Sequence, residues 1–197
     1  MQKVWLTLVA FLCFVPVSAA HAQAFPSEAG FRYSAELSNA SAGTCGCFTM
    51  QGAAADLYWN LSHSEPDGNT GFRMGLAVDI GGEHTGNVNG SGYGLTLITF
   101  TAGPRFILPG DKLRIFAQAL FGLAHGSESQ FPNGNSVESS ANSFAVDLGA
   151  GADYSLNKRI SVRILQLDYL RTALPNNSTA WQNNLRIGAG LTLHFSH

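Results

Sequence analysis

The feature that most constrains this chain is an alternation with a period of two residues. Large apolar side chains occupy every second position between Phe72 and Ile80, and charged or small residues stand between them. The same pattern returns over residues 144–156 and 181–195. Period two is typical of a β-strand with two unlike faces, so each of these segments needs an apolar cover for one face.

The start of the chain is typical of a cleaved export signal. Lys3 precedes an apolar run from Val4 to Val17, and Ala22-Gln23-Ala24 supplies small residues for cleavage. The run is shorter than the ~20 residues that a membrane-spanning helix needs. We therefore predict a signal peptide over residues 1–24 and one domain over residues 25–197.

The rest of the chain is apolar by alternation and never by a continuous run. Only 12% of all residues are charged, and no stretch after residue 25 is typical of a membrane-spanning helix. An exported chain of this kind predicts a β-barrel in a bacterial outer membrane. The formal net charge of −2 argues against a nucleic-acid partner.

The alternating segments and the turn residues between them predict an all-β fold, an eight-stranded antiparallel up-and-down transmembrane β-barrel. The expected strands cover residues 31–38, 48–61, 71–81, 93–106, 113–125, 142–156, 160–171 and 181–195.

The connections orient this barrel. Residues 108–112 and 157–159 form short turns, whereas residues 82–92, 126–141 and 172–180 form longer polar loops. Short turns face the periplasm in such barrels and long loops face the exterior, although residues 62–70 are longer than this rule expects. Outward aromatic residues near the periplasmic end predict an interfacial girdle. They are Phe31, Trp59, Phe72, Phe106, Tyr154 and Phe195.

The opposite face of the strands carries the charges. The predicted lumen charge network consists of Arg32, Glu36, Asp56, Arg73, Asp79, Glu83, Arg105, Arg114, Asp147, Asp153, Arg163, Asp168 and Arg186. Side chains fill an eight-stranded barrel, so nearly balanced charge inside predicts a salt-bridged plug and no open channel. Arg73→Ala should then leave carboxylates unpaired and cost about 3–5 kcal/mol.

Two strands break the alternation. Leu95 and Leu97 are out of phase with Phe100, and Ile164 and Leu165 are two successive apolar residues. A β-bulge in each strand would restore the register.

The alternative to a membrane barrel is a soluble barrel of lipocalin type, which would place apolar residues inside and charges outside. The inward position of the charges disfavours it.

Several segments resemble the small outer-membrane barrels of the OmpA transmembrane-domain and OmpX/Ail kind, the outer membrane protein β-barrel domain sequences. These segments are residues 103–106, 116–122, 166–170 and 182–186. The last strand resembles the assembly signal of such barrels through Gly190, Leu193 and Phe195, although two residues follow Phe195. The resemblance implies contact with outer-membrane lipid and with the barrel-assembly machinery. We expect a monomer.

Cys45-Gly46-Cys47 lies in the first predicted outer loop, and export places it in an oxidising compartment. A local disulfide between Cys45 and Cys47 is the first interpretation, with a metal site and free or intermolecular thiols as alternatives. The neighbouring sequence lacks further metal ligands, so we predict neither a metal nor a cofactor.

Three functions remain open. The first is a non-enzymatic structural barrel with a plugged lumen and surface-exposed loops. The second is an adhesin that binds a surface ligand through its outer loops. The third is a lipid-A-modifying enzyme, for which His125, Ser127 and Glu128 would supply base, nucleophile and carboxylate. That cluster opens a Ser- and Gly-rich loop, where such residues are common without catalysis, so the enzyme is disfavoured.

Overall fold

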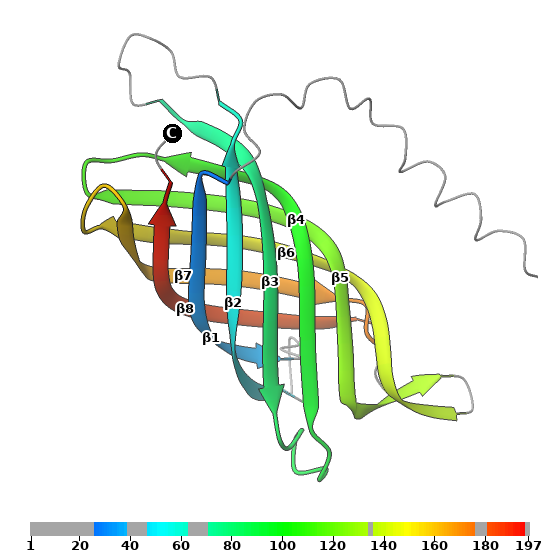
Figure 1. Cartoon of the computed structure of the whole chain (residues 1–197). Coiled ribbons are helices and arrows are strands. Elements are labelled where there is room, and N and C mark those ends of the chain that lie inside the picture. Colours follow the sequence, from blue (N-terminus) through cyan, green and yellow to red (C-terminus); the bar gives the residue numbers. More distant parts are fainter. Residues whose placement is uncertain (1–25, 39–46, 63–70, 134–135, 176–180, 196–197) are drawn as a thin grey trace, which may run out of the picture.

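The structure, a computed structural model, describes residues 26–38, 47–62, 71–133, 136–175 and 181–195. Eight antiparallel strands form a closed barrel in sequence order, in which the first strand pairs with the second and the last (Figure 1). The strands are β1 (Glu28–Ser38), β2 (Phe48–Asn60), β3 (Arg73–Thr85), β4 (Leu95–Leu108), β5 (Leu113–Asn133), β6 (Ser136–Ser155), β7 (Ile160–Thr172) and β8 (Gln182–His194). The predicted fold is confirmed. The predicted signal peptide lies outside the described residues.

The barrel has two different ends. At the end that we call the turn end, the first and last described segments meet, and the Phe195 amide donates to the Ser27 carbonyl oxygen over 2.9 Å. The short connections after β4 and β6 lie at the same end. The opposite end, which we call the loop end, carries the connection between β3 and β4 and the far end of the β5–β6 hairpin. No described segment forms a helix that is long and apolar enough to span a membrane.

The two faces of the sheet differ as the alternation predicts. In β3, Met74, Leu76 and Ile80 point outward and are exposed, whereas Asp79 and Glu83 point inward and are buried. Large exposed apolar side chains occur on the outer face of every strand. A water-soluble barrel gains nothing from such a surface, so the lipocalin-type alternative is wrong. Among the turn-end aromatic residues, the Phe72 and Phe106 rings stack with centroids 5.3 Å apart.

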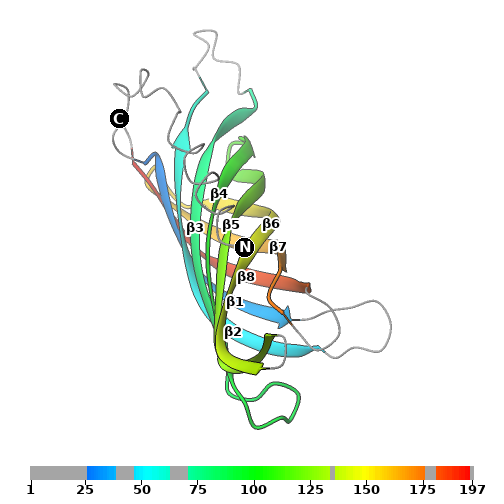
Figure 2. The same cartoon turned by 90° about the vertical axis from the view of Figure 1, so that its right-hand side faces the viewer.

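The hairpin of β5 and β6 is longer than predicted. Residues 126–141, expected to form a loop, instead continue the two strands to Asn133 and Ser136, beyond the ends of their neighbours (Figures 1 and 2). The pairing shifts register between Ser127 and Phe131. Backbone hydrogen bonds between neighbouring strands need no apolar side chains, so a Ser- and Asn-rich segment can extend a hairpin.

One of the two predicted bulges is present. In β7 the pairing to both β6 and β8 shifts by one residue between Arg163 and Gln166, so Ile164 and Leu165 both face outward. In β4 the predicted bulge is wrong, because its pairing with β3 is continuous. Leu95 and Leu97 instead point inward with the rest of their face.

Candidate functional site: the barrel interior

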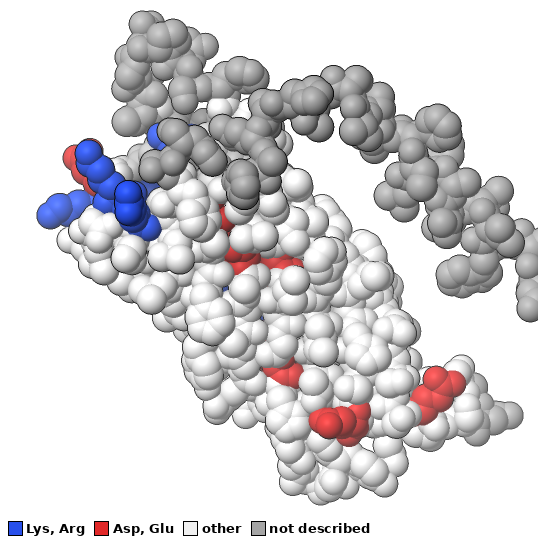
Figure 3. Space-filling model, in the orientation of Figure 1, with Lys and Arg blue, Asp and Glu red and all other residues white. Residues whose placement is uncertain are grey.

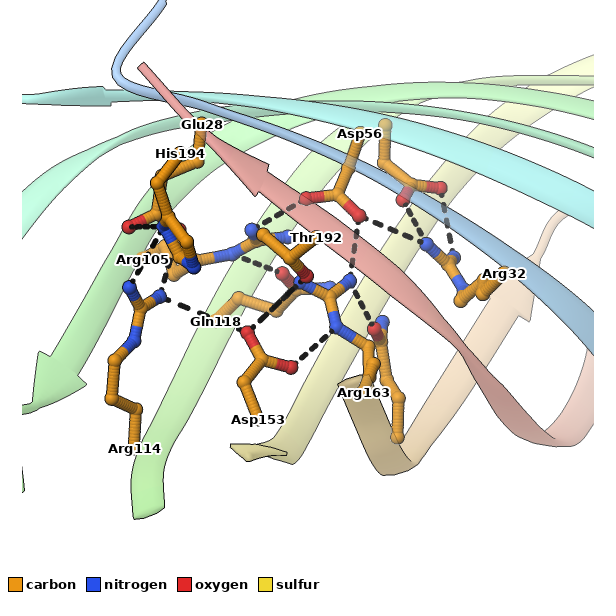
Figure 4. A network of polar contacts seen from close by, with 12 residues as sticks. Glu28, Arg32, Asp56, Arg105, Arg114, Gln118, Asp153, Arg163, Thr192 and His194 are labelled. Carbon is orange, nitrogen blue, oxygen red and sulfur yellow. Dashed lines mark hydrogen bonds and ion pairs between the residues drawn. The ribbon is translucent and has the colours of Figure 1, made fainter. Parts of the chain in front are cut away.

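A carboxylate on β2 is the centre of the ion pairs in the turn-end half of the interior (Figure 4). Arg105 and Arg163 each place a guanidinium nitrogen 2.6 Å from an oxygen of Asp56. Arg32 lies 3.6 Å from the same carboxylate and 2.6 Å from Asp79. All three arginines are at most 1% exposed. These contacts join strands β1, β2, β3, β4 and β7 through the interior.

An aromatic ring supports the same cluster. The guanidinium groups of Arg105 and Arg163 lie 4.9 Å and 4.7 Å from the centroid of the Phe116 ring, within the range of a cation–π contact. Gly151 on β6 leaves room for this ring, since a Cβ atom there would lie 2.5 Å from its Cζ. Arg163 also donates from Nε to Asp153 over 2.9 Å.

A second centre lies nearer the loop end, around an arginine on β8. Arg186 lies 3.1 Å from Glu36 and 3.1 Å from Glu83, and it is fully buried. Its distance to Asp147 is longer, 3.9 Å. One oxygen of Asp147 has no hydrogen-bond partner among the described residues. Asp147 is therefore the least compensated carboxyl in this group.

Apolar side chains fill the interior beyond Arg186. This loop-end cluster consists of Met50, Leu95, Leu97, Ala124, Phe131, Ala145, Leu170 and Leu174, all of them buried. Phe131 comes from the extended part of β5. The sequence predicted a polar, salt-bridged lumen and did not predict this apolar cluster. The signal was available, because Leu95 and Leu97 are in phase with the inward Thr99, Thr101 and Arg105.

One predicted member of the network is misplaced. Arg73 is exposed at the turn end, and none of the ion pairs between described residues includes it. It is the first residue of β3, so its side chain lies at the rim and not in the filled interior. The expected cost of 3–5 kcal/mol for Arg73→Ala is therefore withdrawn.

The rim also holds a cluster of which the sequence predicted only Arg114 and Asp153. Arg114, which is partly exposed, lies 2.8 Å from Glu28 and 3.7 Å from Asp153. His194 lies 3.4 Å from Glu28 and accepts or donates a 2.7 Å hydrogen bond with Ser161. Glu28 and His194 are in phase with Arg32 and Arg186 on their strands, so extending the alternation outward would have found both.

The buried charges are less balanced than predicted. Four arginines are buried among the described residues, against eight carboxyl groups. The four are Arg32, Arg105, Arg163 and Arg186; the eight are Glu28, Glu36, Asp56, Asp79, Glu83, Asp147, Asp153 and Asp168. The expected near balance fails because Arg73 and Arg114 lie at the rim and because the buried Glu28 was not predicted. The interior is thus filled but acidic.

The other predicted residues are distributed over the surface and the ends. Cys47 takes part in a disulfide, and its predicted partner Cys45 lies outside the described residues. Of the predicted assembly signal, Leu193 and Phe195 face outward at the turn end, whereas Gly190 packs against the backbone of β1. The described residues contain no group of three or more His, Cys, Asp or Glu side chains arranged to hold a metal ion.

The three residues of the enzyme hypothesis do not form one cluster. His125 on the outer face of β5 lies 2.7 Å from the side-chain oxygen of Asn142 on β6. Glu128 turns away and accepts a 2.6 Å hydrogen bond from Thr96. Its φ of 65° is left-handed, where the register of the hairpin shifts. Asn142, and not Glu128, is therefore the side chain that orients His125.

An apolar outer surface around a filled, charged interior defines the class of this protein: it is a membrane β-barrel. The model of the outer membrane protein beta-barrel domain matches residues 7–192. The chain therefore belongs to this family and is an outer-membrane protein. No curated protein sequence matches it significantly.

Solved structures with a similar fold have different roles. Ail, the attachment invasion locus protein of Yersinia pestis, has a TM-score of 0.52 and 15% identity over 85% of this chain and 99% of its own. Neisserial surface protein A has a TM-score of 0.55 and 13% identity over 85% and 96%. The outer membrane enzyme PagL has a TM-score of 0.53 and 16% identity over 84% and 99%. At these identities the similarity shows the fold alone.

Proposed function

We propose that this protein is a non-enzymatic structural barrel of the outer membrane whose interior is sealed. The single observation that supports the proposal is the filling of the interior by side chains. In the turn-end half, buried arginines on β4 and β7 pair across the interior with Asp56 on β2, and the loop-end cluster of apolar side chains lies beyond them. Ions would have to break these buried pairs to pass, and breaking a buried pair costs several kcal/mol.

Ion conductance tests this proposal. The chain without residues 1–24 is refolded into lipid vesicles, and heat-modifiable gel migration on the same sample establishes that it is folded. Fusion of these vesicles with a planar bilayer should then give no stepwise conductance. The matched control is the double variant Arg105→Ala, Arg163→Ala, which removes two buried guanidinium groups from the turn-end half; where its migration shows a folded barrel, it should conduct more than the unaltered chain. Steady conductance of the unaltered chain would refute a sealed barrel.

A second function, binding at the cell surface, is favoured by the β5–β6 hairpin. This hairpin extends beyond the barrel, and Phe131 anchors it in the loop-end cluster. It presents an exposed Val137 and the acidic Glu128 and Glu138. Ail has been solved in complex with the heparin analogue sucrose octasulfate. The acidic hairpin here suits a neutral or basic partner better than such a polyanion, because like charges repel.

Substitutions at the hairpin tip test surface binding without removing the anchor. Val137→Ser combined with Glu138→Gln should reduce attachment of expressing cells to a surface and leave heat-modifiable migration unchanged. The control is Asn157→Ser, in the turn between β6 and β7 at the opposite end. Equal attachment by all three strains would count against this function.

A third function, a lipid-A-modifying enzyme, is favoured only by the contact between His125 and Asn142, with Ser127 on the same outward face. A histidine oriented by a side-chain oxygen can act as a base toward a neighbouring hydroxyl group. Ser127→Ala and His125→Ala should then each abolish a change in lipid A mass that the unaltered chain produces. If the unaltered chain changes no lipid A mass, this reading fails.

A further inference from the structure

The turn end of the barrel opens into a cavity of about 720 Å³, which we call the vestibule. Its walls come from the turn-end parts of β1 to β6 and β8 and from the turns that follow β4 and β6. The side chains that matter for its chemistry are Tyr58, Arg73, Lys112, Arg114, Lys158 and His194.

The vestibule is positively charged. Arg73, Lys112 and Lys158 line it, and none of the ion pairs between described residues includes them. Asp111 also lines it, and Glu28 is already bound by Arg114 and His194. In Figure 3 the Lys and Arg side chains gather at this end of the molecule, with one acidic patch beside them. Basic groups thus exceed acidic ones.

Two polar groups of residues that line the vestibule have no hydrogen-bond partner in the described part of the chain. The Tyr58 side chain is buried, 1% exposed, and its hydroxyl makes no hydrogen bond to any described residue. Arg114 Nε is likewise buried and unpartnered. Buried donors without an acceptor are few in folded proteins, and each one requires an explanation. Both donors belong to residues that line the same cavity.

We propose that the vestibule binds the phosphate group of an anionic ligand. Arg and Lys side chains are donors without acceptor atoms, and the Tyr58 hydroxyl adds one more donor deep in the cavity. A phosphate offers several acceptor oxygens and negative charge, which match this set of donors. The turn end faces the periplasm if the barrel follows the usual orientation. The phosphate can then come from a lipid headgroup or from a soluble periplasmic molecule. The proposal does not depend on the sealed interior.

Binding of inorganic phosphate tests the soluble source. The refolded protein in uncharged maltoside micelles is titrated with phosphate at constant ionic strength, and the heat of binding is measured. Native mass spectrometry tests the lipid source by comparing retention of phosphatidylglycerol with retention of diacylglycerol, which lacks the phosphate. Saturable binding in the first arm or selective retention in the second supports the proposal and identifies the source. The absence of both saturable phosphate binding and selective lipid retention would overturn the proposal.

Variants locate the binding in the vestibule. Tyr58→Phe, Arg73→Gln and the pair Lys112→Gln, Lys158→Gln should each weaken binding about tenfold, the usual effect of losing one charge-assisted hydrogen bond. Arg171→Gln is the control, because Arg171 is an exposed cation that lies over Trp181 at the loop end. Tyr58→Phe should not lower the unfolding midpoint, since it removes an unpartnered group. Unchanged binding by all three vestibule variants would place any phosphate elsewhere and refute the proposal.

Discussion

At the scale of single residues, two buried carboxyl groups of the interior differ in how well arginines compensate their charge. Asp56 lies within ion-pair distance of three arginines, two of them at 2.6 Å. Asp147 has one long ion-pair contact of 3.9 Å, and one of its oxygens has no hydrogen-bond partner among the residues that the structure describes. Both are buried to the same degree, so the difference between them lies in their partners and not in their exposure.

Replacing each of these two carboxyls by an amide should therefore have opposite results. Asp56→Asn leaves buried arginines uncompensated and should lower the free energy of unfolding by about 3–5 kcal/mol. Asp147→Asn removes a poorly compensated charge and should leave that free energy unchanged or raise it. Urea unfolding in phospholipid vesicles, followed by tryptophan fluorescence, measures both. Equal losses for the two variants would contradict this account of the network.

The contact between Gly151 and Phe116 makes a second prediction. Gly151→Ala adds a methyl group 2.5 Å from the ring and should cost about 1–3 kcal/mol by overpacking. Phe116→Leu in the same chain should recover part of this loss, measured by the same urea unfolding. Ala150→Val is the control, since Ala150 faces outward and is exposed. Overpacking would be the wrong cause if Gly151→Ala were as stable as the control.

At the scale of strands, alternation predicted the elements well and their departures from regularity less well. The period of two predicted the positions of all eight strands, because successive side chains of a strand face the lipid and the barrel interior in turn. It placed the bulge in β7 for the same reason, since two successive outward residues cannot fit a regular strand. It failed at Leu95 and Leu97, where inward apolar residues were taken for a change of phase. Alternation indicates which residues of a strand lie on the same face. It does not indicate how the polarity of that face changes along the strand.

The bulge in β7 allows a test by deletion. Removal of Ile164 leaves Arg163, Leu165 and Gln166 in regular alternation and makes the pairing to β6 and β8 continuous. The variant should fold, shown by heat-modifiable migration. Removal of Leu167, three residues further on, would instead turn Asp168 toward lipid and should prevent folding, because a charged side chain at the lipid face is destabilising. If neither deletion folds, the bulge is required for closure of the barrel.

At the scale of the whole molecule, the balance of exposed charges differs between the two ends. At the turn end four basic residues, Arg73, Lys112, Lys158 and Arg159, are exposed together with Asp111. At the loop end Glu128 and Glu138 are exposed together with Arg171. The sequence predicted the sign of the interior less accurately, because it counted Arg73 and Arg114 as inward. Whether a residue near a strand end lies inside or at the rim depends on where the ladder begins, which alternation does not determine.

The orientation of this charge difference can be measured in intact cells. Short turns face the periplasm in bacterial barrels, so the loop end should face the exterior. In a chain with Cys45→Ser and Cys47→Ser, Val137→Cys places a single thiol at the exposed tip of the β5–β6 hairpin, and Lys158→Cys places one at the turn end. A membrane-impermeant maleimide should label Val137→Cys in intact cells and Lys158→Cys only after the outer membrane is permeabilised. The reverse labelling pattern would show that the barrel has the opposite orientation in the membrane. The vestibule, with its basic side chains, would then face the outside of the cell.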